Sequence, residues 1–184
     1  MELKDKLITS FVAFEQQLSG EHDTLHNIRL EGLKTFEDKG FPTKKEEAWK
    51  YTSLNSILKQ DFCVVPKKEV AVDYKDVKQY FLSDSDTYKL VFINGVFSSH
   101  LSSTTHDGLD VCLMSSALTK PKYKMLIDTY YNSITDKEDS LTALNAAYAV
   151  EGAFVNIPKS KVVSKPIEIV YLSTAGEQAL LVQP

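Results

Sequence analysis

Apolar residues recur at intervals of three and four along the first forty positions, which is the spacing of one face of a helix. The apolar positions of the first run are Leu3, Leu7, Phe11, Phe14 and Leu18. They predict a helix over residues 3–19. A second helix is expected from Asp23 or Thr24 to Gly40, because Pro42 prevents its continuation. The simplest arrangement of the two helices is an antiparallel pair.

The segment GFPTKKEEAWKYTSL, residues 40–54, places the only tryptophan of the chain among charged side chains. Thr43 and Glu46 have the spacing of a capping box, so a short helical turn is expected through Trp49. Ser53 is expected to cap a second short turn.

We interpret this segment as an internal latch that packs on the helix pair. The aromatic residues of the latch are Phe41, Trp49 and Tyr51. The single arginine, Arg29, is expected to pair with Glu46 or Glu47, although a role in ligand binding is the alternative for it. An exposed Trp49 would instead be an anchor for a partner protein.

Strand and helix patterns alternate between residues 61 and 150. The dipeptide Asn94-Gly95 lies between β-branched and aromatic residues and is typical of two-residue hairpin turns, so a hairpin is expected at 90–98. Helices are expected within residues 117–150. The apolar stripe of the first of them is predicted to contain Tyr123, Leu126 or Ile127, Tyr130 and Ile134.

After Gly152 the helical pattern ends, and apolar runs of four to six residues follow between turn residues. Such runs favour short strands of a sandwich edge, a barrel portion or a β-solenoid. We therefore predict an α+β chain in three parts. These are a helical region at 1–60, a mixed α/β region at 61–150 and a strand-rich region at 151–184.

Charge and hydropathy argue against two classes of partner, nucleic acids and membranes. The formal net charge is −4, and the 21 cationic residues include one arginine, whereas nucleic-acid readers use clustered arginines. We therefore expect no nucleic-acid partner. No apolar run approaches the roughly 20 residues that span a bilayer, and the N-terminal residues lack the apolar core of a targeting peptide. We expect a cytoplasmic protein without membrane association.

Few groups in the sequence can carry chemistry, and the glycines are too far apart to form a phosphate-binding loop. Cys63 and Cys112 lie in apolar strand-like runs, which favours buried reduced thiols over a disulfide or a catalytic thiolate. His22 and His26 share a helix face but lack further metal ligands. A loop with solvated polar residues contains His100, His106, Asp107 and Asp110. We assign no catalytic, cofactor-binding or metal residue.

Several motifs in order along the chain resemble one protein family. They are Arg29 and Leu33, Gly40-Phe41-Pro42-Thr43, Glu47, Trp49-Lys50-Tyr51-Thr52, FINGVFSSHLS, Leu144-Asn145-Ala146, Gly152, Pro158 and Pro166-Ile167. Together they resemble the N-terminal part of the SufD family, a subunit of the SufBCD iron-sulfur cluster assembly complex. Ser160 departs from the pattern, because glycine or asparagine is common at this turn position.

The resemblance implies a fold and a function. The helical region would lead into a right-handed parallel β-helix whose first turns are residues 151–184, and the exposed end of this truncated β-helix would allow self-association. The resemblance also implies a non-catalytic scaffold subunit without a cofactor, which works through contacts with SufB and SufC. The contact with SufC would lie outside this chain.

Two other functional classes stay open. A metal- or sulfur-handling enzyme would use Cys63, Cys112 and the loop from His100 to Asp110. A carbohydrate-binding or lyase-like β-solenoid would need a groove of carboxylates and aromatic rings, which the sequence does not indicate. Labelling of the thiols under native conditions separates the enzyme from the scaffold.

Overall fold

The computed structural model describes residues 2–18, 24–63, 71–82, 85–103, 108–174 and 179–180. They form two compact units. The helical unit takes the described residues of Met1–Val65, Leu126–Val150 and Gly176–Gln183, and the sheet unit takes those of Pro66–Met125 and Glu151–Ala175. The chain is mixed α+β, as the sequence predicts. Among the described helices, none has the length and apolarity to cross a membrane.

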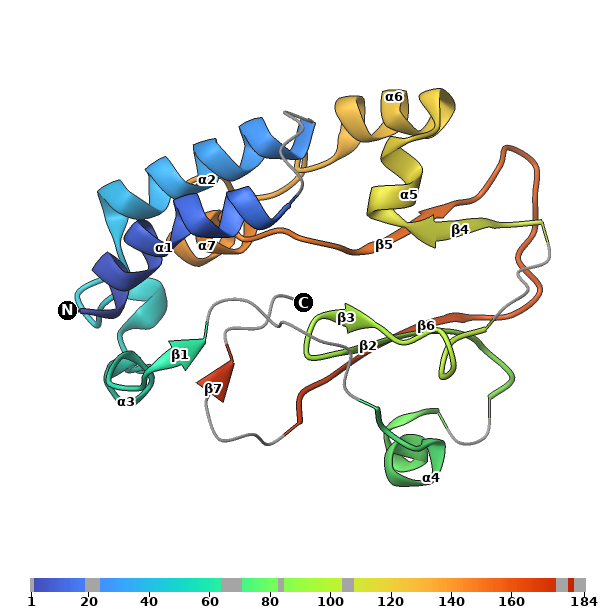
Figure 1. The fold of residues 1–184 in the computed structure, drawn as a ribbon, viewed down its shortest axis with the longest axis horizontal. Coiled ribbons are helices and arrows are strands. Elements are labelled where there is room, and N and C mark those ends of the chain that lie inside the picture. The colour runs from blue at the N-terminus through green and yellow to red at the C-terminus, as the bar shows by residue number, and fades with distance from the viewer. Residues whose placement is uncertain are drawn as a thin grey trace. The chain divides into compact units, whose positions relative to one another are not determined.

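Two antiparallel helices are the main elements of the helical unit (Figure 1). Helix α1 spans Leu3–Gln17 and helix α2 spans Thr24–Lys39, so both predicted helices are confirmed. Their periodic apolar residues face a common core. The buried cluster contains Leu3, Leu7, Phe11, Phe14, Phe36, Ala143, Leu144, Ala147 and Tyr148.

Helix α7, Ser140–Ala147, packs on α2. Asp139 caps its N-terminus by accepting a hydrogen bond from Thr142 N at 2.7 Å. At Gly32 the two helices approach so closely that a Cβ atom would lie 2.5 Å from Ala143 O. Any side chain at this position would push the helices apart.

The other elements of the helical unit are short. They are the 3-10 turn η1 at Glu47–Trp49, helix α3 at Asn55–Leu58, and the parallel strands β1 at Phe62–Cys63 and β7 at Ala179–Leu180. Thr43 N donates to Glu46 Oε1 at 2.8 Å, which is the predicted capping-box bond. Asn55 N donates to Ser53 Oγ at 3.4 Å, but the N-cap residue of α3 is Leu54, which makes no side-chain cap, so the prediction that Ser53 caps this turn is wrong.

Helix α6, Pro121–Tyr130, contains residues of both units. Its Ile127 is buried, as the predicted stripe requires. Tyr130 and Ile134 are 66% and 96% exposed, so the stripe through these two positions is a wrong prediction. Ile134 lies beyond the end of the helix, where the helical period no longer decides where a side chain points, and Tyr130 is the last residue of the helix.

A three-stranded sheet with the order β3–β2–β6 is the largest sheet of the sheet unit. Its strands are β2 at Tyr88–Ile93, β3 at Val96–Phe97 and β6 at Ile167–Leu172. β2 and β3 form the predicted hairpin, with φ angles of 51° at Asn94 and 81° at Gly95, as a type I′ turn requires. β2 and β6 are parallel and pair along their full lengths.

A separate antiparallel pair consists of β4 at Asp110–Leu113 and β5 at Ala153–Asn156. Three short helical segments complete the sheet unit: α4 at Tyr74–Val77, η2 at Lys78–Tyr80 and α5 at Met114–Leu118. The second buried cluster of the chain contains Val77, Phe81, Val91, Ile93, Leu101 and Val170.

The described residues after Gly152 form the strands β5, β6 and β7, but they complete no turn of a β-helix. In a β-helix each strand stacks on the equivalent strand of the next turn. Here β5 pairs with β4, β6 with β2 and β7 with β1, so the three strands belong to three different sheets. The β-helix therefore stays a prediction.

Candidate functional site

Of the two cysteines, the side chain of Cys112 is described. It is a free, half-buried thiol on β4, and loss of hydration raises its pKa above the ordinary value. A raised pKa keeps the sulfur protonated at neutral pH, whereas a nucleophile or metal ligand must be a thiolate. The side chain of Cys63, on β1, lies outside the described residues.

The loop group predicted from sequence is only partly described, because His106 and Asp107 lie outside the described residues. Both ring nitrogens of His100 have partners. Nδ1 lies 3.0 Å from Ser98 Oγ, and Nε2 lies 2.9 Å from Val72 O. His100 therefore holds two loop segments of the sheet unit together.

Asp110 has partners on other elements. It accepts a hydrogen bond from Asn156 Nδ2 at 2.8 Å and lies 3.5 Å from Lys122 Nζ. The hydrogen bond from Asn156, and next the one from Tyr123, lowers the pKa of the Asp110 carboxyl. Within the described part of the chain, no three histidine, cysteine, aspartate or glutamate side chains are placed to hold a metal ion.

Arg29 is buried, but its partner is not the predicted one. Its Nε donates to Glu15 Oε1 at 2.5 Å, and its Nη1 donates to Ala149 O at 3.2 Å. Glu46 and Glu47 are exposed, so the predicted pairing with them is wrong. The face of α2 that carries Arg29 packs towards α1, which brings the guanidinium to Glu15 instead.

His26 contacts the other oxygen of the same carboxylate, with its Nδ1 beside Glu15 Oε2. His22, its partner in the predicted weak metal site, lies outside the described residues. The Glu15 carboxylate thus connects α1 to two cationic or hydrogen-bonding groups of α2. This arrangement positions the helix pair and explains Arg29 without a ligand.

The predicted latch around Trp49 is confirmed only at one of its aromatic residues. Phe41 packs edge-on against Phe36, with ring centroids 5.0 Å apart. Trp49 is half-buried, but Tyr51 is 90% exposed, so its predicted packing on the helices is wrong. The short η1 turn directs Tyr51 away from the core that Phe41 joins.

The β3–β2–β6 sheet has apolar side chains on both faces. Side chains alternate along a strand, so the first face carries Val91, Ile93 and Val170, which are buried. The second face carries Leu90, Phe92, Phe97, Ile169 and Tyr171. Tyr171 stacks on Phe92 with ring centroids 5.1 Å apart, yet Tyr171 and Ile169 are each 45% exposed.

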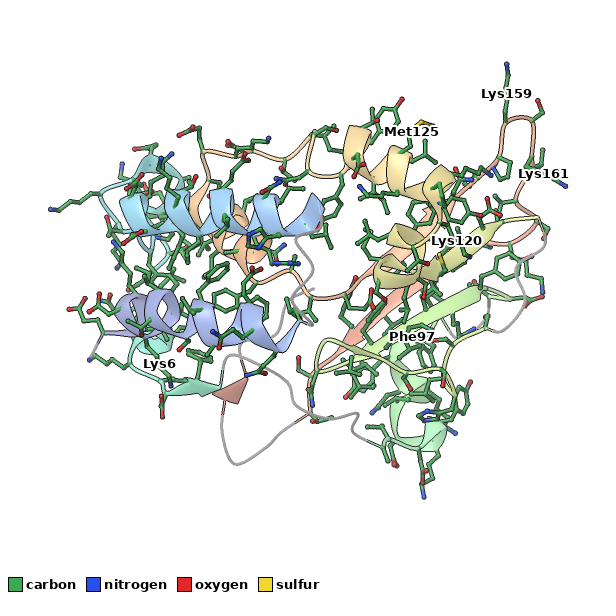
Figure 2. All side chains as sticks on the ribbon, turned by 45° about the horizontal axis from the view of Figure 1, so that its top comes forward. Lys6, Phe97, Lys120, Met125, Lys159 and Lys161 are labelled. Carbon is green, nitrogen blue, oxygen red and sulfur yellow. The ribbon has the colours of Figure 1, made fainter. Side chains whose placement is uncertain are left out.

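A cavity of about 320 Å³ lies on this second face. Its apolar walls are Leu90, Phe92 and Phe97 of the sheet, together with Val111, Leu113 and Ala153 of the β4–β5 pair. Phe97 is labelled in Figure 2. A sheet with apolar residues on both faces requires cover on both. The second face is covered incompletely by β4 and β5.

Serines continue the β3 edge of the β3–β2–β6 sheet along β2. Ser102 Oγ accepts from Val91 N at 2.9 Å, and Ser103 Oγ accepts from Lys89 N at 2.8 Å. Ser98 N and Ser103 N donate back to Val91 O and Lys89 O, both at 2.8 Å. The segment after β3 therefore continues the pairing along β2 without being a strand.

The other edge, β6, is open in the described part of the chain. Tyr88 N donates to Pro166 O and Asn94 N donates to Leu172 O, at the two ends of the ladder. In a parallel ladder, every second residue of a strand bonds to the same neighbour. The backbone groups of Ile167, Ile169 and Tyr171 therefore point to the open edge.

Glu168 positions β6, and sequence reasoning missed this residue. Its side chain is 7% exposed and accepts hydrogen bonds from Leu82 N at 2.8 Å and Thr87 Oγ1 at 2.7 Å. Lys89 Nζ lies 3.8 Å from the same carboxylate. The available signal was a glutamate on the inward phase of the strand IEIVYL, since a buried charge requires partners.

Residues 1–169 match the SufBD protein N-terminal region, and this range includes most of the residues of both units. The chain belongs to the SufBD family. It is 27% identical to an iron-sulfur cluster assembly SufBD family protein of Synechocystis sp., over 90% of this chain and 34% of that protein. It is 26% identical to the iron-sulfur cluster assembly protein SufD of Bacillus subtilis, over 85% of this chain and 36% of that protein.

The resemblance to the SufD family noted in the sequence is thereby confirmed. The chain spans about a third of the length of these two SufBD relatives. The SufBD match ends at Ile169, in the middle of β6. The open edge therefore lies where the SufBD N-terminal region ends.

Proposed function

We propose that this chain serves as a non-catalytic scaffold part in iron-sulfur cluster assembly and acts through protein contacts. The observation that carries the proposal is the incompletely covered apolar face of the β3–β2–β6 sheet, in a member of the SufBD family. Half-exposed apolar side chains such as Ile169 and Tyr171 are what a protein partner can bind. The names of both relatives refer to iron-sulfur cluster assembly.

The alternative of a metal- or sulfur-handling enzyme gains no support from the described residues. The Cys112 thiol has a raised pKa, and the nitrogens of His100 are occupied by Ser98 and Val72. Asp110 is paired with Asn156. We therefore propose no catalytic residue and no resident cofactor.

We also propose that residues 151–184 lead into a right-handed parallel β-helix. The parallel pairing of β6 with β2 supports this, because a parallel sheet with an open edge accepts further parallel strands. The division into a helical region at 1–60, a mixed region at 61–150 and the start of the β-helix at 151–184 belongs to the same proposal.

The proposed partners are SufB and SufC, with the SufC contact outside this chain, in the cytoplasm and without nucleic acid or membrane. A pull-down tests this with two baits, the 184-residue chain and a chain extended to the length of its relatives. We expect the extended chain to capture both partners and the 184-residue chain to lose SufC. Capture of SufC by the 184-residue chain would overturn the placement of that contact, and capture of neither partner by the extended chain would overturn the scaffold role.

The reactivity of Cys112 separates the scaffold from the enzyme. Because burial raises its pKa, we expect alkylation at neutral pH to be slower than for a free cysteine thiol, whose pKa is about 8.5. The rate should reach half of its maximum above that pH. Mass spectrometry of the labelled peptide measures the rate at each pH. Fast labelling at neutral pH with zinc or iron retained through purification would favour the enzyme.

A further inference from the structure

Two segments of the sheet unit, residues 111–125 and 152–167, carry lysines and no acidic residue. Their lysines are Lys120, Lys122, Lys124, Lys159, Lys161 and Lys165. The antiparallel pairing of β4 with β5 puts Asp110 opposite Asn156, so the turn after β5 lies beside the start of β4. The fold therefore brings charges of one sign from distant parts of the chain to one end of the strand pair.

Tyr123 holds the start of α6 on β5. Its ring packs on the ring of Phe154, with centroids 4.9 Å apart. Lys120 Nζ and Lys122 Nζ lie 5.3 Å and 5.2 Å from the centroid of the same tyrosine ring. A lysine ammonium group beside an aromatic ring gains a cation–π attraction, so both ammonium groups are held near this ring.

Lys161 lies at the same end of the strand pair. An added Cβ atom at Gly108 would lie 3.1 Å from Lys161 Nζ, so the lysine side chain passes over this glycine. Two residues later, Asp110 lies 3.5 Å from Lys122 Nζ. Figure 2 shows Lys159 and Lys161 projecting from the turn after β5. We define the basic cluster as Lys120, Lys122, Lys159 and Lys161.

The basic cluster differs from other lysines in the described part of the chain, six of which form ion pairs with carboxylates. These pairs are Lys6–Asp61, Lys39–Glu138, Lys50–Glu47, Lys75–Asp73, Lys89–Glu168 and Lys165–Asp86. Within the described residues, Lys122 is the one member of the cluster with such a partner. That partner, Asp110, also accepts a hydrogen bond from Asn156 Nδ2 at 2.8 Å. The basic cluster therefore keeps a net positive charge.

The composition of the basic cluster indicates the chemistry of its partner. A surface that serves solubility alone mixes both signs of charge, whereas a surface of one sign attracts a partner of opposite charge. Phosphate groups are commonly bound by arginine, whose planar fork donates two parallel hydrogen bonds. The single arginine of the chain, Arg29, is in the helical unit. Lysines without arginine favour carboxylates, which they bind as mobile point charges.

From these contacts we infer that the basic cluster binds an acidic segment of a partner protein, with glutamate or aspartate carboxylates beside the lysine ammonium groups. Lys122 is 68% exposed and stays accessible to such a segment while it contacts Asp110. Exposed ion pairs are individually weak, so the attraction is the sum of several pairs and depends on salt. The inference goes beyond the proposed scaffold function, because it names a second surface and the charge of its partner.

Fluorescence anisotropy tests the inference with the 184-residue chain and a labelled peptide of alternating glutamate and serine. We expect saturable binding that weakens by about tenfold or more from low to high salt, because salt screens exposed charges. A peptide with lysine in place of glutamate should not bind, since like charges repel.

Charge reversal locates the binding surface. The combined variant Lys120→Glu, Lys122→Glu and Lys161→Glu should raise the Kd of the acidic peptide by about tenfold or more. Glutamine at the same three positions removes the charges without adding new ones, so it should raise the Kd by a smaller factor. Circular dichroism melting checks that both variants fold.

A matched control separates the basic cluster from the net charge of the chain. The combined variant Lys44→Glu, Lys45→Glu and Lys75→Glu changes the net charge by the same amount at exposed lysines outside the cluster. It should change the Kd of the acidic peptide by about twofold or less, because exposed charges act over short distances in salt.

Four results would each overturn the inference. They are a wild type without saturable peptide binding, a reversed cluster that binds like the wild type, a control variant that loses binding as the reversed cluster does, and a wild type that binds a DNA duplex or phosphatidylglycerol vesicles more tightly than the acidic peptide.

The outcome is separate from that of the proposed function. Absence of peptide binding, together with capture of SufB and SufC by the extended chain, removes the basic docking surface and leaves the scaffold role intact. Peptide binding that is lost on charge reversal, together with capture of neither partner, leaves the docking surface intact and removes the scaffold role.

Discussion

The core of the helical unit and the second face of the β3–β2–β6 sheet differ in how completely their apolar side chains are buried. In the helical unit Leu7 and Phe36 are fully buried, and Tyr148 is 5% exposed within the same cluster. In the sheet unit one face of the β3–β2–β6 sheet is buried as completely, but Ile169 and Tyr171 on the other face are 45% exposed. The difference therefore lies between the closed core of the helical unit and the second face of the β3–β2–β6 sheet, and not between all apolar residues of the two units, because Tyr51 and Ile134 of the helical unit are also exposed.

The largest expected effect on the free energy of unfolding comes from truncating a buried apolar residue of the helical unit, compared with a half-exposed one of the sheet unit. Phe36→Ala should lower the free energy of unfolding by about 3 to 5 kcal/mol, because it leaves a cavity beside Phe41 in a closed core. Ile169→Ala should cost less than about 1 kcal/mol in the monomer, since the side chain is half-exposed. Urea unfolding at low protein concentration measures both. Equal losses would remove the distinction between the units.

The helix contact at Gly32 gives the next effect. Gly32→Ala should destabilise the helical unit by about 1 to 3 kcal/mol, because the new Cβ atom would lie 2.5 Å from the backbone oxygen of Ala143. Gly152→Ala is the control, as an added Cβ there has no atom within 4 Å. Thermal unfolding of the two variants should show a lower midpoint for Gly32→Ala alone.

Tyr148 adds a pH dependence to the helical core. Its hydroxyl donates to Leu7 O at 2.5 Å, and burial raises its pKa above the ordinary tyrosine value of about 10. The folded state therefore favours the protonated Tyr148 hydroxyl. Its contribution to the free energy of unfolding is complete below about pH 10 and is lost as the pH rises further. Tyr148→Phe should cost about 1 kcal/mol at pH 7 and reduce the alkaline loss. Unfolding at pH 7 and above pH 10 provides the comparison.

The smallest expected effect is a gain in the stability of the sheet unit. Ser160 has a φ of 67° in a turn closed by Lys161 N and Pro158 O at 3.1 Å. A left-handed conformation has a steric cost for serine and none for glycine. Ser160→Gly should therefore raise the free energy of unfolding by about 0.5 kcal/mol. Ser116→Gly, on the exposed side of α5, should lower stability by a similar amount. Opposite signs in urea unfolding would confirm the strain at Ser160.

Local patterns in the sequence predict the elements well. The periodic apolar residues of α1 and α2, the bond from Thr43 N to the Glu46 carboxylate, and the Asn94-Gly95 turn form as predicted. In each case the interacting residues are neighbours along the chain or lie on one face of one element. The physics that decides these features is therefore contained in a short window.

The wrong prediction for Arg29 concerns partners that are distant in sequence. Arg29 pairs with Glu15 instead of Glu46 or Glu47, because the packing of α2 on α1 selects the partner. The parallel pairing of β2 with β6 depends equally on the whole fold, and no spacing in the sequence indicates its register. The open edge, on which the candidate site rests, follows from that register and could not be predicted without it.

Amide hydrogen exchange along β6 tests the central claim most directly, because it reports each backbone group of the open edge. In dilute chain we predict slow exchange at Glu168, Val170 and Leu172, which bond to β2, and fast exchange at Ile167, Ile169 and Tyr171. Slow exchange at the outward three would contradict the account.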